Sequence, residues 1–271
     1  MERIKQALER AKREREGSAP SNRATVREIV TPHATGRTED IVYTETRVFK
    51  PDPAVLESNR VIGSAAASAV ADAYRMLRTR TLQRMKENQW TSLMVTSPGM
   101  EEGKSLTAVN LAISMAREVS HTVLLVDLDL RRPGIHEFFG YEPEAGLVDV
   151  LESKANMSDA LFNPSVERLV VLPSKRRVDN SSEILSSPEM LSVIAEIKAR
   201  YPERIVIFDM PPVLSTDDAL AFSPNVDAVM LVVAEGETGK GELAQVHEVL
   251  SESNIIGTVL NKAANFNTAY Y

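Results

Sequence analysis

The chain has 271 residues, of which 43% are hydrophobic and 25% are charged, and its formal net charge at pH 7 is −7. This length can bury the core of one large α/β domain and leave residues for an appendage. The absence of cysteine excludes disulfides, thiol nucleophiles and cysteine-ligated metals, and the four scattered histidines lack the spacing of a zinc site. The acidic balance argues against bulk binding to nucleic acid.

Two segments precede the predicted main domain. Residues 1–16 carry apolar side chains at helical spacing among charged ones, which predicts an amphipathic helix. Residues 17–60 are polar and contain several prolines, so we interpret them as a linker with a short strand at 40–48. The apolar stretches are far shorter than the roughly 18 residues of a membrane-spanning helix, and the N-terminus lacks a signal-peptide core. A cytoplasmic location is therefore expected.

Residues 61–264 are predicted to form an α/β domain, because short apolar runs alternate with segments of helical period. This alternation indicates a mostly parallel sheet with helices on both faces. A helix with a basic face is expected first, at 66–87. Strands are then expected at 92–96, 123–127, 169–172, 205–209, 228–233 and 256–260, and helices at 104–119, 146–162, 188–200, 217–223 and 239–252.

The first predicted strand leads to the triplet Gly103-Lys104-Ser105 at the start of a helix. The unpaired N–H groups and the positive dipole of a helix start can hold a polyphosphate. Lys104 would place a positive charge beside the phosphates, and the Ser105 hydroxyl would ligate Mg²⁺. Only the second half of the motif G-x-x-x-x-G-K-[ST] matches, because Pro98 holds the first glycine position and Gly99 is the other loop glycine. By itself, the triplet is equally consistent with a solvated turn.

Two later strands end in carboxylates. Asp127 and Asp129 follow the run VLLV, and Asp209 follows IVIF. In an open parallel sheet, ligands bind beyond the carboxyl ends of the strands, so these side chains are expected near the loop. Carboxylates there can hold Mg²⁺ through water or accept a proton from an attacking hydroxyl. Each motif alone could be a solvated loop, but their joint occurrence in this order is far more specific.

With these motifs, the chain resembles the bacterial tyrosine autokinases of exopolysaccharide biosynthesis (BY-kinases), which belong to the deviant P-loop ATPases. The resemblance covers roughly residues 66–271, and the N-terminal helix is similar to the start of the soluble, exosortase-associated branch. It is carried by the loop ending in GKS, by LLVDLDLRRP, IVIFDMPP, NSSEILSSPEM at 180–190 and VLNKA at 259–263, and by the terminal Tyr270-Tyr271.

The resemblance implies an ATP-dependent kinase that autophosphorylates Tyr270 or Tyr271 in a C-terminal tail, residues 265–271. Phosphorylation would occur in trans between the subunits of a ring. The implied partner is a membrane protein that governs polysaccharide chain length and export, and it would recruit the kinase to the inner face of the plasma membrane. A cognate tyrosine phosphatase is a further expected partner.

The resemblance also implies roles for individual residues. Asp209 would be the outer-sphere Mg²⁺ partner, while Asp127 and Asp129 would divide metal organisation and activation of the tyrosine hydroxyl. Arg131 matches the family's arginine after the paired aspartates. The nucleotide would contact Gly99, Gly103, Lys104, Ser105, Leu106 and, near the adenine, Asn261. The oligomerisation signature E-x-x-R-x-x-R is matched by Asp72, Arg75 and Arg78, with aspartate in place of glutamate.

One departure lies in the loop. Close relatives carry proline-glycine-glutamate-glycine before the lysine, whereas this chain has Met100-Glu101-Glu102-Gly103, so Glu101 occupies a glycine position. A side chain there resists the conformations that glycine permits, and reduced nucleotide affinity is expected. An alternative is therefore a nucleotide-binding regulatory or positioning module of the export machinery with little or no kinase activity.

Two other function classes fit the sequence less well. A positioning ATPase of the partition type would carry a second lysine early in the loop, and this chain does not. A dinucleotide oxidoreductase is disfavoured because no G-x-G-x-x-G follows the first strand.

Overall fold

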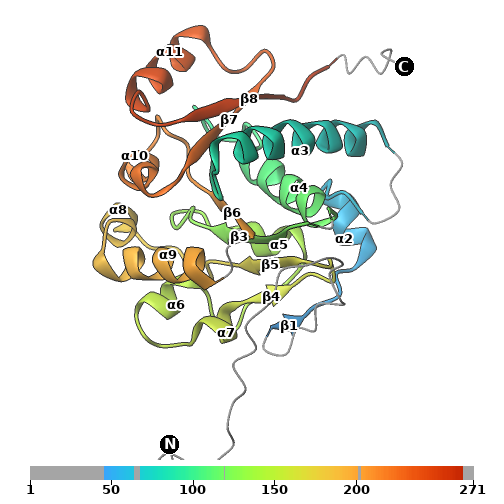
Figure 1. Cartoon of the computed structure of the whole chain (residues 1–271), viewed down its shortest axis with the longest axis vertical. Coiled ribbons are helices and arrows are strands. Elements are labelled where there is room, and N and C mark those ends of the chain that lie inside the picture. Colours follow the sequence, from blue (N-terminus) through green and yellow to red (C-terminus); the bar gives the residue numbers. More distant parts are fainter. Residues whose placement is uncertain (1–45, 64–67, 119, 201–202, 265–271) are drawn as a thin grey trace, which may run out of the picture. The chain divides into compact units, whose positions relative to one another are not determined.

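The computed structural model describes residues 46–63, 68–118, 120–200 and 203–264. They form an eight-stranded sheet in the order β1-β4-β5-β3-β6-β2-β7-β8, in which all neighbours are parallel except β4 and β5 (Figure 1). The predicted α/β class is confirmed. The strands are β1 (Arg47–Val48), β2 (Ser92–Thr96), β3 (Thr122–Asp127), β4 (Phe162–Asn163), β5 (Leu169–Leu172), β6 (Arg204–Asp209), β7 (Ala228–Ala234) and β8 (Ile255–Asn261).

Helices cover both faces of the sheet, as the alternating pattern predicts. One face carries α2 (Pro53–Ser58), α3 (Ala69–Asn88), α4 (Lys104–Ala116) and α5 (Ile135–Phe138). The other carries α6 (Leu147–Leu151), α7 (Met157–Ala160), α8 (Ser181–Leu185), α9 (Pro188–Arg200), α10 (Asp218–Phe222) and α11 (Lys240–Val249), with a 3₁₀ turn at Ser223–Asn225. Within the described ranges, no helix is both long and apolar enough to cross a membrane.

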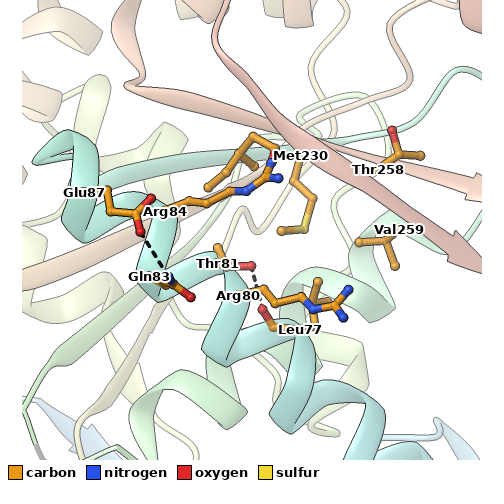
Figure 2. A pocket seen from close by; sticks show the side chains of 11 residues that line it. Leu77, Arg80, Thr81, Gln83, Arg84, Glu87, Met230, Thr258 and Val259 are labelled. Carbon is orange, nitrogen blue, oxygen red and sulfur yellow. Dashed lines mark hydrogen bonds between the residues drawn. The ribbon is translucent and has the colours of Figure 1, made fainter.

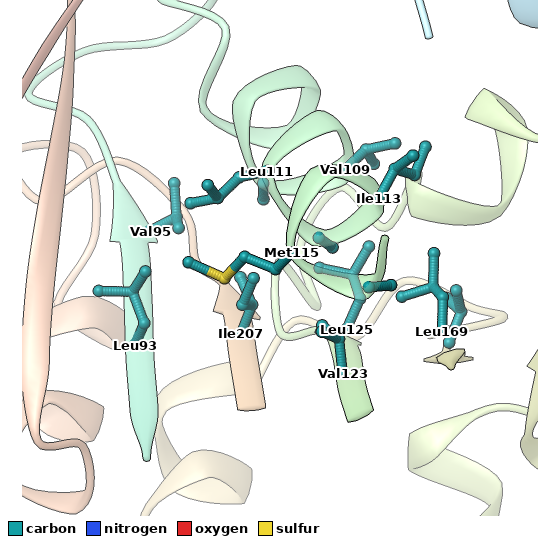
Figure 3. Packing of buried hydrophobic residues seen from close by; sticks show 14 of the residues in the cluster. Leu93, Val95, Val109, Leu111, Ile113, Met115, Val123, Leu125, Leu169 and Ile207 are labelled. Atoms are coloured by element: carbon teal, nitrogen blue, oxygen red, sulfur yellow. The ribbon is translucent and has the colours of Figure 1, made fainter. Parts of the chain in front are cut away.

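The strand period of two divides the core into two halves. On β3, Val123 and Leu125 face α4, whereas Leu124 and Val126 face the opposite helices. The helix α4 is the centre of the first half, because ten of its thirteen residues are buried. Figure 3 shows its side chains against β2, β6 and β3. This packing fixes the start of α4, and therefore the loop before it, relative to the carboxyl ends of those strands.

The six predicted strands are confirmed, and most predicted helices agree to within a few residues. The predicted helix at 146–162 is wrong. Ser153 adopts a left-handed conformation, with φ 56°, and interrupts the helical run after α6. The short helix α7 follows Asn156, whose backbone N–H donates to the Asp159 carboxylate, and residues 162–163 form β4.

The predicted linker 17–60 is also wrong for its last part. Residues 46–60 contain β1, which pairs with β4, and α2, which Asp52 caps by accepting a hydrogen bond from the Ala54 N–H. Phe49 and Leu56 pack against the core, so the domain begins before residue 61. The predicted helix at 1–16, the rest of the linker and the tail with Tyr270 and Tyr271 lie outside the described residues.

Candidate active site

The three acidic motifs and the loop lie at one edge of the sheet. Strands β3 and β6 are neighbours, and their register places Asp127 opposite Asp209. Strand β2 lies on the other side of β6 and delivers the loop of residues 97–103 to the same edge. The sheet order thus brings together residues that are far apart in sequence.

Glycine at position 103 is required for two physical reasons. Gly103 precedes the first residue of α4 with φ 88°, a left-handed conformation that side chains disfavour. A Cβ atom there would lie 2.1 Å from Nδ2 of Asn261, which is far inside any allowed contact. The start of α4 is therefore tightly packed under the end of β8.

Glu101 and Glu102 behave differently although they are adjacent. Glu101 adopts a left-handed conformation, with φ 61°, and its side chain is exposed, so the carboxylate turns to solvent. Glu102 is buried, and its carboxylate accepts hydrogen bonds from the Gly99 N–H at 2.9 Å and from the Thr238 hydroxyl. The Asn261 amide donates to the Glu102 carbonyl oxygen at 2.8 Å. Sequence reasoning did not assign roles to Glu102 or Thr238, although Glu102 matches the glutamate of the family loop.

Lys104 lies among the carboxylates. Its Nζ is 2.8 Å from Asp129 Oδ2, 3.8 Å from Asp209 Oδ2 and 3.0 Å from Ser105 Oγ. Burial opposes the charge of the ammonium, but the carboxylates of Asp209 and Asp129 outweigh this effect and raise the pKa of Lys104. The lysine is charged when the site holds no ligand.

Asp127 and Asp209 are fully buried, and the positive charge of Lys104 does not balance the negative charges of the surrounding carboxylates. Burial, with Asp209 as a close neighbour, raises the pKa of Asp127 from 3.8 to about 8, although it accepts N–H bonds from Gly134 and Ile135 at 3.0 Å. Burial likewise raises the pKa of Asp209 to about 6, against the opposing effect of Lys104. Oδ1 of Asp209 is buried without a hydrogen-bond partner. The site therefore has an excess of negative charge.

This excess suits a divalent cation bound together with phosphates. Among the described residues, no group of three or more acidic or histidine side chains could hold a metal ion by itself. Mg²⁺ at a nucleotide site is held by one or two protein oxygens plus phosphates and water, so an all-protein cage is not required. The Ser105 hydroxyl and the unpartnered oxygen of Asp209 fit that kind of coordination.

Arg131 is not part of the carboxylate cluster. Its Nε donates to Asp218 Oδ2 at 2.8 Å, and Asp217 lies 3.8 Å from its Nη2. Asp218 is fully buried and also accepts from the Ser181 hydroxyl at 2.7 Å. The loop after β3 is thereby tied to α10 and to α8, which begins in the stretch NSSEILSSPEM.

The predicted oligomerisation residues lie on α3, apart from the loop. Asp72 and Arg75 are exposed and form an ion pair within the helix. Arg78 donates to the Ser114 carbonyl oxygen of α4 at 3.1 Å. Their contact with another subunit stays a prediction.

Two large cavities flank α3. One, of about 580 Å³, adjoins the site and is lined by the first half of α3, by Leu106 and Thr107 of α4 and by the end of β8 with Asn261. The other, of about 520 Å³, lies between the second half of α3 and β8, where Arg80, Arg84 and Met230 are among the residues that line it (Figure 2). The first cavity is lined by Leu106 and Asn261, two of the predicted nucleotide contacts, whereas the second contains neither, so the first is the one that adjoins the site.

Comparisons with known proteins agree with this geometry. The family described as AAA domain matches residues 100–255. Tyrosine-protein kinase YwqD of Bacillus subtilis (strain 168) is 35% identical over 208 residues, which cover 76% of this chain and 86% of that protein. Succinoglycan biosynthesis transport protein ExoP of Rhizobium meliloti (strain 1021) is 29% identical over 209 residues, 75% of this chain but 26% of ExoP.

A solved structure supports the same assignment. The kinase domain of the Escherichia coli tyrosine kinase ETK superimposes with a TM-score of 0.68 at 26% identity, and the match covers 83% of this chain and 87% of that one. The P-loop ATPase fold, the carboxylates around Lys104 and the similarity to YwqD point to one family. The chain belongs to the bacterial tyrosine-protein kinases of P-loop ATPase type.

Proposed function

We propose that this kinase transfers the γ-phosphate of MgATP to Tyr270 or Tyr271 of a second copy of the chain. The observation that carries the proposal is the position of Lys104, charged and buried, between Asp129 and Asp209 at the start of α4. A lysine held there can exchange its carboxylate partners for phosphate oxygens when nucleotide arrives. The N–H groups of the first turn of α4 would bind the same phosphates.

The proposal divides the chemistry among three carboxylates. Asp127, which lies opposite Asp209 in the sheet register, would help to organise the metal or accept the proton of the attacking hydroxyl. Asp209 and Ser105 would hold Mg²⁺, which neutralises charge on the phosphates during transfer. Asp129 would keep Lys104 in place. Arg131, the counterpart of the family's arginine after the paired aspartates, would take part in catalysis from the position in which Asp218 holds it.

The exposed side chain of Glu101 favours a working kinase over a regulatory module that has lost activity. The module interpretation depended on a side chain that resists the backbone conformations of glycine, yet Glu101 adopts the left-handed conformation and its side chain is exposed. Gly103 retains its own left-handed conformation at the start of α4. Glu101 therefore costs free energy through its backbone conformation, and its side chain does not block phosphates from the loop.

The proposed setting is polysaccharide export. The name of ExoP joins a transport role to succinoglycan biosynthesis, and this chain matches about a quarter of that protein. We infer that a separate membrane protein that governs chain length supplies the remaining part and recruits the kinase to the inner face of the membrane. A tyrosine phosphatase would reverse the modification, and the surface with Asp72, Arg75 and Arg78 would join subunits of a ring.

Phosphotyrosine mapping tests the proposal. Purified protein is incubated with MgATP, and the C-terminal peptide is analysed by mass spectrometry. We expect phosphate on Tyr270 or Tyr271 and at least about 100-fold less in Lys104→Met, because the lysine stabilises the transferring phosphoryl group. Equal labelling of Lys104→Met would contradict the proposal.

A mixing experiment tests transfer in trans. The variant Tyr270→Phe/Tyr271→Phe retains the site but lacks acceptors, whereas Lys104→Met retains acceptors but lacks the lysine. We expect phosphate on the tail of the Lys104→Met chain only when the two are mixed. If the wild type is labelled but the mixture is not, transfer occurs within one chain.

A further inference from the structure

Residues at the β7–β8 edge of the sheet contact the phosphate-binding loop. Thr238 lies in the segment between β7 and α11, and Asn261 is the last residue of β8. Both side chains contact Glu102, Thr238 through the carboxylate and Asn261 through the carbonyl oxygen. The loop itself comes from β2, so three strands meet at one buried glutamate.

The Glu102 carboxylate makes an unusual set of contacts for a buried charge. It is 5% exposed, and its hydrogen bonds come from the Gly99 N–H and the Thr238 hydroxyl, both neutral donors. A buried carboxylate without hydrogen bonds is costly, so each of these donors contributes strongly. Thr238 is itself fixed, because its oxygen accepts from the Ala234 N–H at 2.9 Å. The hydroxyl therefore has one available orientation, with its proton on Glu102.

The bond from Gly99 to Glu102 closes the loop on itself. It folds residues 99–102 into a turn directly before Gly103 and Lys104. Without the Thr238 hydroxyl, the Glu102 carboxylate would gain by turning toward water, and the turn would open. The N–H groups that should converge on a phosphate would then no longer be held in place before binding.

We propose that Thr238 is a positioning residue for nucleotide binding, which acts through Glu102 to hold the phosphate-binding loop in its binding conformation. The inference rests on the proposed binding of ATP at this loop. Phosphates occupy the loop both before and during transfer, so the support acts equally on the ground state and the transition state. Its loss raises KM for ATP and leaves kcat nearly unchanged.

The test compares Thr238→Val with Thr238→Ser. Valine keeps the shape of threonine but lacks the hydroxyl, whereas serine keeps the hydroxyl. We expect about a tenfold rise in both the Kd and the KM for ATP in Thr238→Val, since a hydrogen bond to a buried charge is lost. Thr238→Ser should stay within about twofold of the wild type. Thr122→Val, at the opposite end of β3 from the site, is the matched control and should bind like the wild type.

Binding is measured by calorimetry with MgATP, at a temperature at which circular dichroism shows every variant to be folded. Wild-type affinity in Thr238→Val, equal weakening in Thr238→Val and Thr238→Ser, or a fall in kcat at constant KM would each overturn the proposal. Because Kd is measured without turnover, the positioning role is tested even if the tail tyrosines are not phosphorylated. A wild-type protein that does not bind ATP would overturn both proposals, whereas binding without phosphotyrosine would contradict only the first.

Discussion

At the scale of single residues, the sequence indicated the chemistry of the site but not its supports. Lys104, Asp127 and Asp209 were identifiable because glycine-lysine-serine and strand-terminal aspartates have a recognisable local context. Thr238 had no such signal, and Ser181 had only its place in the stretch NSSEILSSPEM, since a hydroxyl group resembles any solvated hydroxyl until its partner is known. Their partners, Glu102 and Asp218, become neighbours only through the fold.

Glu101 provides a prediction at this scale. Replacement by glycine should raise the free energy of unfolding by about 0.5–1 kcal/mol, because the left-handed conformation is unfavourable for a residue with a Cβ atom. The side chain is exposed, so no packing is lost. Urea denaturation at pH 7 measures the change.

The control for this prediction is Glu101→Gln, which removes the charge but keeps the Cβ atom. We expect it to match the wild type to within about 0.5 kcal/mol. If glutamine stabilises the protein as much as glycine does, charge repulsion in the loop rather than backbone conformation is responsible.

At the scale of elements, long periodic segments were predictable and short ones were not. The six strands from β2 to β8 that carry apolar runs were located from sequence. Of the two strands with two residues each, β1 lies at the end of the short strand predicted at 40–48, whereas β4 was not predicted. These two strands exist because they pair with each other and with β5 at the edge of the sheet. Tertiary pairing, not local propensity, determines them.

Phe49 tests whether residues 46–60 belong to the domain. Its ring packs on the core, with its centroid 5.1 Å from that of Tyr141. Phe49→Ala should reduce the free energy of unfolding by about 2–3 kcal/mol, less than for a fully buried phenylalanine. Val48, which is 59% exposed, is the matched control, and Val48→Ala should change stability by less than about 0.5 kcal/mol. Equal effects of the two substitutions would restore the linker interpretation.

At the scale of the whole molecule, the order of the strands generates the electrostatics of the site. The sequence predicted a parallel sheet but could not order its strands, because that order depends on which connections cross over which neighbours. The adjacency of β3 and β6 places Asp127 beside Asp209. Strand β2 leads through the loop to α4, whose first residue is Lys104. One lysine among three carboxylates leaves the ligand-free protein with buried like charges.

This arrangement predicts a pH dependence of global stability. Because the pKa of Asp127 rises to about 8 and that of Asp209 to about 6, the folded protein binds more protons than the unfolded chain above about pH 4. Stability without nucleotide or divalent cations should therefore fall as the pH rises from about 4 to about 8. Urea denaturation in EDTA across this range measures the slope.

The variant Asp127→Asn imitates the protonated carboxyl at every pH. It should remove most of the slope between about pH 6 and 8, and at pH 8 it should be more stable than the wild type. Parallel pH profiles for the two proteins would show that Asp127 is ionised in the folded state at neutral pH, contrary to this expectation.

The contact between Gly103 and Asn261 has a consequence for how such a protein can change over evolutionary time. Residues 103 and 261 are distant along the chain, yet a Cβ atom on residue 103 would lie 2.1 Å from the amide nitrogen of Asn261. A larger residue at 103 could be accepted only after the asparagine had been replaced, and that replacement would remove the hydrogen bond to the loop. Relatives that keep an asparagine at the end of β8 should therefore also keep glycine directly before the lysine.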